Sequence, residues 1–270
     1  MRDIDTLACG ALLCDLAICE MTLDVIKTDL KEILYLRKVY LQENNFQIRY
    51  NARHERNWSD SYFVMYNNEK IGYGSVTWQE NRDARDTVFE FYIIPPFRNL
   101  ASAAFIKLLQ TSKAIFIESQ TNDVLTSSLL REFGQDVVSN VILFEDNATT
   151  DIRIDNVIFR KRIESDVVFE HNAEPAGDYV LEWNNEIIAS GGFLLHYNMP
   201  FADLYMEVRN DCRKKGFGSF LIQEIKKQCY LAGRVPAART GVENIGSKAT
   251  LLKAGLKIAG HMLLANVKSL

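Results

Sequence analysis

The residues in this chain best placed to do chemistry form a short basic run between an expected strand and an expected helix. The run consists of Arg213, Lys214, Lys215, Gly216, Phe217, Gly218 and Ser219. Glycines leave room for a ligand to approach the backbone closely. The first N–H groups of a helix have no intrahelical partner and attract anions. Together with three cationic side chains, these features predict a site for a diphosphate group.

The elements that must position this run follow an order that occurs twice along the chain. Hydrophobic periodicity and turn residues predict second-half strands over 179–183, 186–197, 202–208, 235–239 and 257–264, with helices over 217–231 and 246–254. They predict first-half strands over 62–66, 71–78, 88–94, 114–118 and 137–145, with helices from about residue 28 to 42 and over 99–110 and 123–132. Each half therefore contains a hairpin, a strand, a loop and a helix, then a strand, a helix and a strand. An internal repeat explains this order.

The two copies differ at the loop. Setting Arg98 against Arg213 places Ala101 and Ala103 against the two glycines of the second copy. The first copy keeps the order strand, arginine, helix, but without glycines its backbone has less room for a phosphate. We therefore expect only the second half to bind the ligand through this loop.

Length and composition are typical of a globular protein that contains one large or two ordinary domains. The polar segment 146–151 predicts a boundary, with an N-terminal extension at 1–20, a first domain at 21–148 and a second at 149–270. A net charge of −4 argues against a nucleic-acid or anionic-membrane partner. No apolar stretch approaches the length of a membrane span. We expect a cytoplasmic protein, either a monomer or a homodimer.

The cysteines and histidines do not predict a metal site. Three of the five cysteines (Cys9, Cys14 and Cys19) recur near the start, but they form no Cys-x-x-Cys pair and no histidine is nearby. The simplest interpretation is that they are ordinary thiols in a reducing compartment. We therefore expect no bound metal.

Residues 160–265 resemble the GNAT superfamily, the GCN5-related N-acetyltransferases. The strongest part is Val208 to Gly218, which is similar to the family's acyl-CoA pyrophosphate loop, Arg/Gln-x-x-Gly-x-Gly/Ala. Residues 244–247 are similar to its Asn-x-x-Ala/Ser segment, and residues 251–256 to the Tyr-x-x-x-Gly-Phe ending that follows. The first half resembles a degenerate copy, so the chain resembles a tandem GNAT protein. The implied fold class is α/β, with two GNAT-like domains, each a twisted mixed sheet flanked by helices.

The resemblance implies that acetyl-CoA, or another acyl-CoA, lies where the central strands of the second half splay apart. Its pyrophosphate would lie on backbone N–H groups from Lys214 to Ser219, and Val208 would bond the pantetheine arm. Asn244 and Ser247 would contact the same ligand from the next helix. The implied binding residues are Val208, Arg213, Lys214, Lys215, Gly216, Phe217, Gly218, Ser219, Asn244 and Ser247.

The resemblance also implies direct acyl transfer to an amine, which must lose a proton. Strand alternation puts Glu207 on one face with Asp203 and Tyr205. Glu207 is the candidate base; the alternative is that it balances Arg209 or Arg213 on a solvated face. The family's usual acid, a tyrosine, is replaced by Leu251. Either Tyr205 substitutes for it, unless Tyr205 is a core residue, or the thiolate leaves without a dedicated acid.

Two other functions stay open beside an N-acyltransferase acting on a small-molecule amine or a peptide. The replacement at Leu251 suggests a non-catalytic acyl-CoA-binding regulatory module. A transferase that uses aminoacyl-tRNA is the third candidate, and the acidic composition weighs against it. A first-half cluster of charged and aromatic residues could line an acceptor pocket across the domain junction or form a polar connection, which we favour. Its members are Arg49, Tyr50, Arg53, His54, Glu55, Arg56, Trp58 and Tyr62.

Overall fold

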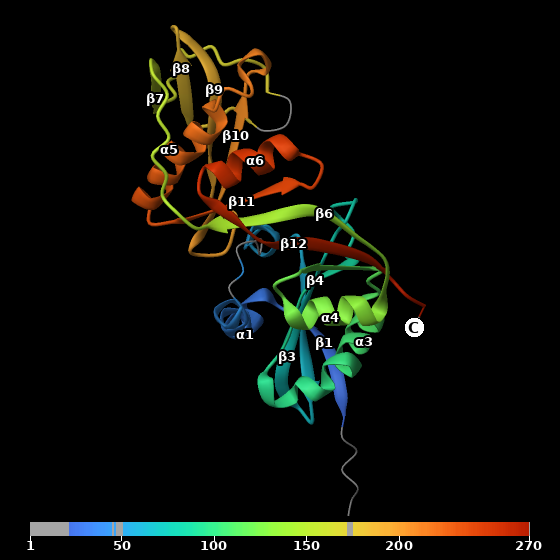
Figure 1. Cartoon of the computed structure of the whole chain (residues 1–270). Helices are drawn as coiled ribbons and strands as arrows, with labels where there is room; N and C mark the ends of the chain where they lie inside the picture. The colour runs from blue at the N-terminus through green and yellow to red at the C-terminus, as the bar shows by residue number, and fades with distance from the viewer. Residues whose placement is uncertain (1–21, 45, 47–50, 172–174, 270) are drawn as a thin grey trace, which may run out of the picture.

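The structure is a computed structural model that describes residues 22–44, 46, 51–171 and 175–269. The expected extension at 1–20, its three cysteines, Arg49 and Tyr50 therefore lie outside the described residues. The described strands form a 12-stranded mixed sheet in the order β1-β2-β3-β4-β5-β12-β6-β11-β10-β9-β8-β7. Figure 1 shows the two halves at opposite ends of this sheet, with β6 and β12 between them. The expected α/β class is confirmed.

The first half supplies the elements up to β6. They are β1 (Leu23–Thr28), α1 (Leu30–Glu43), α2 (Asn51–Glu55), β2 (Asp60–Tyr66), β3 (Glu69–Thr77), β4 (Thr87–Ile93), a 3-10 helix (Pro95–Leu100), α3 (Ala101–Ser112), β5 (Phe116–Gln120), α4 (Val124–Phe133) and β6 (Gly134–Asp146). The second half supplies β7 (Val157–Lys161), β8 (Tyr179–Trp183), β9 (Glu186–Leu194), β10 (Phe201–Val208), a 3-10 turn (Asn210–Cys212), α5 (Phe217–Leu231), β11 (Val235–Gly241), α6 (Ile245–Lys253) and β12 (Leu256–Val267).

Local sequence explains most of these elements. The hairpin turns at Asn67-Asn68 and Asn184-Asn185 have positive φ at all four residues, which asparagine tolerates and tight hairpins require. Helix α5 buries Leu221, Ile222, Ile225 and Cys229, the spacing of one helical face. These side chains pack in a core with β10 and α6, while α3 and α4 pack in a separate core on the first half of the sheet.

Three short elements differ from the expectation. Residues 23–28 form edge strand β1, which pairs with β2, so the first helix begins at Leu30. Edge strand β7 and the five-residue helix α2 were also not predicted. An edge strand has a neighbour on one side only, so it needs little of the alternating pattern that marks a buried strand. In β1 only Val25 is buried.

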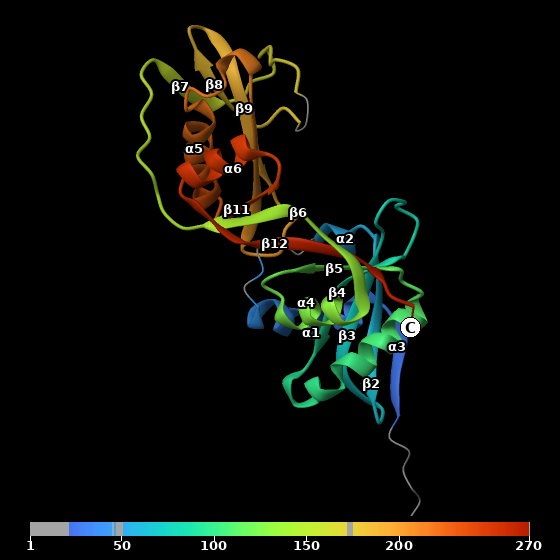
Figure 2. The same ribbon diagram turned by 45° about the vertical axis from the view of Figure 1, so that its right-hand side comes forward.

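The halves exchange their last strands. Strand β6 of the first half pairs with β11 through Val141–Glu145, and β12 of the second half pairs with β5 through Met262–Asn266. The two exchanged strands pair with each other through Ile142↔His261 and Val141↔Met262. The strand order of the sheet is therefore symmetric about the β12–β6 pair, and Figure 2 shows the exchanged strands running side by side. The boundary between residues 148 and 149 stays a prediction, because the sheet is continuous across both halves.

The halves differ most on the face of the sheet opposite α3–α6. In the first half, α1 covers this face and packs against Tyr73 and Tyr92. In the second half, the corresponding link between β7 and β8 contains no helix in its described residues. None of the described helices has the length and apolar character needed to cross a membrane.

Candidate active site

A split in the sheet marks the centre of the second half. Strands β10 and β11 pair only from Phe201↔Val235 to Asp203↔Ala237, although β10 stays paired with β9 as far as Val208. Beyond Asp203 the edge of β10 that faces β11 is therefore open to bonding by an extended ligand. Strands β4 and β5 diverge in the same way after Val88↔Ile117. The predicted splay is present in both halves.

The basic run lies at the end of the diverging part of β10. Arg213 Nε donates a hydrogen bond to the Val208 carbonyl at 3.0 Å, which folds the loop back on the strand. Lys214 and Gly216 have φ of 63° and 90°, and α5 begins at the next residue, Phe217. The backbone from Lys214 to Ser219 therefore turns into a helix start, where unpaired N–H groups converge.

The two glycines of the run have different structural roles. A Cβ on Gly216 would have its nearest neighbour, an Ile154 methyl group, at 3.7 Å, so this glycine is needed for its left-handed backbone rather than for space. A Cβ on Gly218 would lie 3.2 Å from Thr250 and 3.3 Å from Met206. Gly218 therefore lets α5 approach α6 and β10 closely.

The matching loop of the first half has another conformation. Arg98 Nε donates to the Ile93 carbonyl at 3.3 Å, so Arg98 does correspond to Arg213. However, the residues after Ile94 form a 3-10 helix that continues into α3, and the Ala101 N–H bonds to Arg98 O. No described residue from 95 to 101 has a positive φ. This geometry is consistent with the expectation that only the second loop binds the ligand, which stays a prediction.

Helix α6 carries the candidate contacts that follow the loop. Asn244 caps the helix, and its Oδ1 accepts the Ser247 N–H at 3.0 Å, which leaves the Asn244 amide NH2 to donate. Ser219 is buried and its hydroxyl donates to Thr250 O at 3.3 Å, which ties α5 to α6. Leu251 is 4% exposed and packs in the core with α5 and β10. An apolar core side chain therefore occupies the position of the family's usual acid.

The candidate base is enclosed. The Glu207 side chain is 8% exposed, with its carboxylate oxygens 3.8 Å from His171 Nδ1 and 3.7 Å from an Arg213 terminal nitrogen. The alternative placed Glu207 on a solvated face, but its side chain is buried. The other part of that alternative, a nearby Arg213, is present. Arg209 instead pairs with Asp211 and Glu186.

His171 lies near this carboxylate, and Tyr205 is two residues before Glu207 on the same face of β10. Tyr205 is half-buried on β10 and lies over Gly192 of the paired strand β9. The His171 ring stacks on Phe169 at 4.7 Å between centroids. Sequence reasoning did not find His171, because it lies on the link between β7 and β8, which has no periodic pattern.

The corresponding face of the first half is filled by an ionic network. Glu90 is fully buried and accepts hydrogen bonds from Arg37 and from the Tyr73 hydroxyl, with His54 Nε2 at 3.2 Å. Burial alone would raise the pKa of Glu90, but its interactions with Arg37 and His54 outweigh this effect and hold that pKa well below its usual range. His54 of the sequence cluster is thus part of this network.

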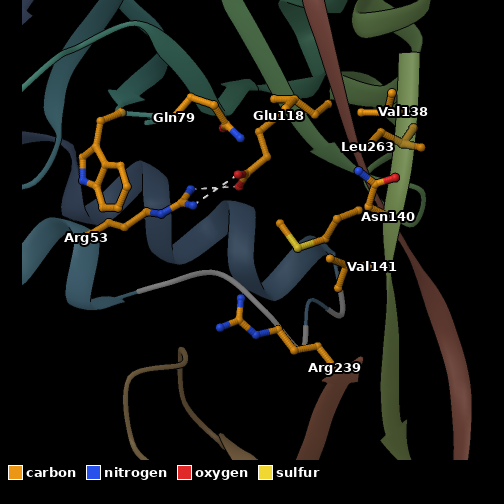
Figure 3. A pocket seen from close by; sticks show the side chains of 11 residues that line it. Arg53, Gln79, Glu118, Val138, Asn140, Val141, Arg239 and Leu263 are labelled. Carbon is orange, nitrogen blue, oxygen red and sulfur yellow. Dashed lines mark hydrogen bonds and ion pairs between the residues drawn. The ribbon is translucent and has the colours of Figure 1, made fainter. Parts of the chain in front are cut away.

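Arg53 of the same cluster lines a cavity of about 240 Å³ between the halves. Figure 3 shows its guanidinium paired with Glu118 and facing Arg239 across the cavity, with Val138, Asn140, Val141 and Leu263 along the other side. The remaining lining residues are Trp78, Gln79, Met262 and Leu264. The structure therefore places His54 in a buried network and Arg53 at a cavity, where we had favoured a polar connection. Tyr62 instead packs in the first-half core, and Arg56 lies over the Trp58 ring. In the described part of the chain, no group of three or more His, Cys, Asp or Glu side chains could hold a metal ion.

Comparisons with known proteins bear on this geometry. Residues 146–256 match the family model "Acetyltransferase (GNAT) family". An acetyltransferase from the GNAT family of Colwellia psychrerythraea is similar in structure, with TM-score 0.70, 14% identity, and coverage of 92% of this chain and 100% of that one. A GCN5-related N-acetyltransferase from Sphaerobacter thermophilus has TM-score 0.60 and 12% identity, and covers 92% of this chain and 96% of its own.

A third similar structure is a tandem GNAT protein from the clavulanic acid biosynthesis pathway, with TM-score 0.57, 10% identity, and coverage of 92% of this chain and 100% of that one. At these identities the three structures establish the fold alone. A comparison with curated proteins gave no match. The family match coincides with the split sheet and the basic loop of the second half, and the fold of the whole chain is that of a tandem protein. Residues 146–256 thus match the model of the GNAT acetyltransferase family, within a chain whose fold is similar to that of a tandem GNAT protein.

Proposed function

We propose that this protein is an acyl-CoA-dependent N-acyltransferase, using acetyl-CoA or another acyl-CoA bound by its second half. The observation that carries the proposal is the loop after β10, where the left-handed Lys214 and Gly216 lead into α5 at the mouth of the split sheet. Such a turn presents backbone N–H groups to a diphosphate. The family match over the same residues supports it.

The residues of the second half suit this ligand. N–H groups from Lys214 to Ser219 would hold the pyrophosphate, the open edge of β10 near Val208 would bond the pantetheine arm, and Asn244 and Ser247 would contact the ligand from α6. The space around Gly216 is open enough for a ligand to approach the backbone. A Cβ built there would have only Ile154 and Lys253 within 4 Å, at 3.7 and 3.9 Å. When bound, acyl-CoA supplies a thioester carbonyl that bonds to the amine nitrogen as the bond to sulfur breaks.

Glu207 is the proposed base in this transfer. It lies one residue before Val208, with its carboxylate 3.8 Å from His171 and 3.7 Å from Arg213, and it takes the amine proton directly or through water. Leu251 has no proton to give, so Tyr205 protonates the thiolate, or the thiolate leaves unaided. A thiol with a pKa of about 8.5 makes unaided departure chemically reasonable.

A panel of small amines and peptides with acetyl-CoA tests the proposal. We expect saturable acyl-CoA binding and turnover of some amine in the wild type. Glu207→Gln should lower kcat about 100-fold or more with an unchanged Kd for acyl-CoA, since general bases contribute roughly that much. Glu164→Gln, at an exposed position of the same half, is the matched control. Absence of binding at millimolar acyl-CoA would refute the proposal.

The buried Leu251 favours a second candidate, a non-catalytic acyl-CoA-binding regulatory module. This candidate predicts binding without turnover of any amine and no effect of Glu207→Gln. We propose the enzyme first, because Glu207 is enclosed beside the cofactor loop. In either case we place the protein in the cytoplasm, as a monomer or a homodimer.

A further inference from the structure

Three exposed lysines surround the start of α5. Lys214 and Lys215 precede Gly216 in the loop, and Lys253 is the last residue of α6. The Lys253 Nζ would lie 3.9 Å from a Cβ on Gly216, which places its ammonium group beside the turn. Among residues 22–44, 46, 51–171 and 175–269, no carboxylate oxygen lies within 4.0 Å of the side-chain nitrogen of any of these three lysines.

This concentration of positive charge is unfavourable without a ligand. Further along α5, Lys226 pairs with Asp146 at 2.7 Å and Lys227 with Glu224 at 2.6 Å. The three unpaired lysines instead gather at a helix start, where free N–H groups already carry partial positive charge. A cation at a helix N-terminus raises the electrostatic energy unless an anion lies between them. The charges around Gly216 therefore indicate an anion that the chain itself does not supply.

The first half provides an internal comparison, because α4 and α6 begin in the same way. Asp123 caps α4 and Asn244 caps α6, and the Oδ1 atom of each accepts the N–H three residues later at 3.0 Å. Nine residues after the cap, the first half has Glu132 where the second half has Lys253. The charge at this position is therefore reversed between the halves.

The reversed charge lies at the start of the preceding helix in both halves. Glu132 Oε2 accepts a hydrogen bond from the Ser102 hydroxyl at 3.0 Å, and Ser102 is the second residue of α3. The first half thus puts its own carboxylate at this helix start, where a negative charge is favourable. Lys253 puts a positive charge beside Gly216, at the start of α5. An anionic ligand there would do for α5 what Glu132 does for α3.

We infer, on the basis of the proposed acyltransferase function, that Lys253 binds the diphosphate of the acyl donor together with the N–H groups of the loop. Its ammonium group donates to a phosphate oxygen, a hydrogen bond strengthened by both charges. This contact makes the second half selective for acyl-CoA over pantetheine thioesters, which carry the acyl group but no phosphate. In the first half Glu132 repels the same diphosphate, which excludes the donor although β4 and β5 also diverge there.

Calorimetry of the full-length protein with three donors tests this inference. The donors are acetyl-CoA, its 3′-dephospho form, which keeps the diphosphate, and acetyl-pantetheine, which has no phosphate. Lys253→Gln should raise the Kd for both nucleotide donors about 5-fold, the value of one exposed ion pair, and leave the Kd for acetyl-pantetheine unchanged. Lys253→Glu, which restores the charge of the first half, should raise the Kd for both nucleotide donors further. Lys227→Gln, about 15 Å further along α5, is the matched control.

The possible outcomes separate this inference from the proposed function. The same Kd for acetyl-CoA in Lys253→Gln and the wild type, or an equal loss for acetyl-pantetheine, overturns the inference and leaves acyl transfer intact. A loss for acetyl-CoA that is absent for the 3′-dephospho form also overturns it, because Lys253 would then bind the 3′-phosphate. Binding of inorganic pyrophosphate that Lys253→Gln weakens, without turnover of any amine, supports the inference and overturns the proposed enzyme.

Discussion

At the scale of single residues, the loop after β10 depends on backbone conformation more than on side chains. Gly216 has φ of 90° in open surroundings, and Gly233, after the end of α5, has φ of 69° and space for a Cβ with no atom within 4 Å. Both positions strain any L-residue by about 1–2 kcal/mol. Only Gly216 lies beside the N–H groups proposed to hold a diphosphate. Comparing substitutions at the two glycines therefore distinguishes an effect of backbone strain from an effect on ligand binding.

Valine at these two glycines should therefore have different effects. Gly216→Val should weaken acyl-CoA binding at least 10-fold by calorimetry, because the strain of about 1–2 kcal/mol is relieved by turning N–H groups away from the ligand. Gly233→Val should lower the free energy of unfolding by the same strain of about 1–2 kcal/mol and leave the Kd for acyl-CoA unchanged. Equal affinity in Gly216→Val and the wild type would contradict the proposed cofactor site.

At the scale of elements, a buried carboxylate holds the first-half helices on the sheet. Arg37 of α1 and His54 of α2 both contact Glu90 of β4, and the Tyr73 hydroxyl of β3 donates to it at 3.0 Å. Arg37 is 6% exposed and also donates to Asn51 at 2.8 Å. Four elements thus meet at one charged residue, on the face where the described residues of the second half form no helix.

The Glu90 network predicts how stability changes with pH. The folded pKa of Glu90 lies well below 4.5 because Arg37 and His54 outweigh its burial. The stabilisation is therefore complete above the unfolded pKa near 4.5, and it is lost as the pH falls towards the folded value. Urea unfolding between about pH 7 and 3 should show this loss in the wild type.

Glu90→Gln should destabilise the protein at neutral pH by about 3–5 kcal/mol, because it leaves the buried Arg37 without its counter-charge. The variant should also show a weaker fall in stability as the pH drops below the ordinary carboxyl range. Glu32→Gln, which removes an exposed carboxylate 3.8 Å from Lys70, is the control and should change little. Parallel pH curves for Glu90→Gln and the wild type would show that the network does not govern acid stability.

At the scale of the whole molecule, strand exchange makes each half depend on the other. β11 is completed by β6, and β5 is completed by β12, so neither half contains all the strands of its own sheet. Asn198 adds a bond across the halves, from its side-chain amide to Phe46 O at 2.9 Å. The cavity lined by Arg53 and Arg239 lies along the same junction.

Separation of the halves tests this dependence. A fragment of residues 149–270 lacks β6, which exposes the edge of β11 and removes the main partner of β12. Alone it should give no cooperative thermal transition as a monomer, whereas co-expression with residues 22–148 should yield a stable complex on size-exclusion chromatography. A monomeric, cooperatively folding 149–270 fragment would show that the exchange is dispensable.

The sequence by itself determined the repeat, most of its strands and helices, and the glycine turn before α5. These features depend on residues close together in the chain: apolar spacing within one element, asparagine pairs in hairpins, and glycine where φ is positive. The alignment of Arg98 with Arg213 was also available from the repeated order of strand, arginine and helix. The structure agrees with it, because both arginines donate to the carbonyl five residues earlier.

Only the tertiary structure decided how the halves are joined and what surrounds the split sheet. The exchange of β6 and β12 results from pairing between strands far apart in the chain, such as Ile142 with His261, which leaves no local pattern. The cavity residues Arg53, Glu118 and Arg239, and the approach of His171 to Glu207, come from separate segments for the same reason. Edge strands β1 and β7 were missed because a strand with one neighbour needs little hydrophobic alternation. Local sequence specified the loop for the cofactor, and long-range packing formed the cavity beside it.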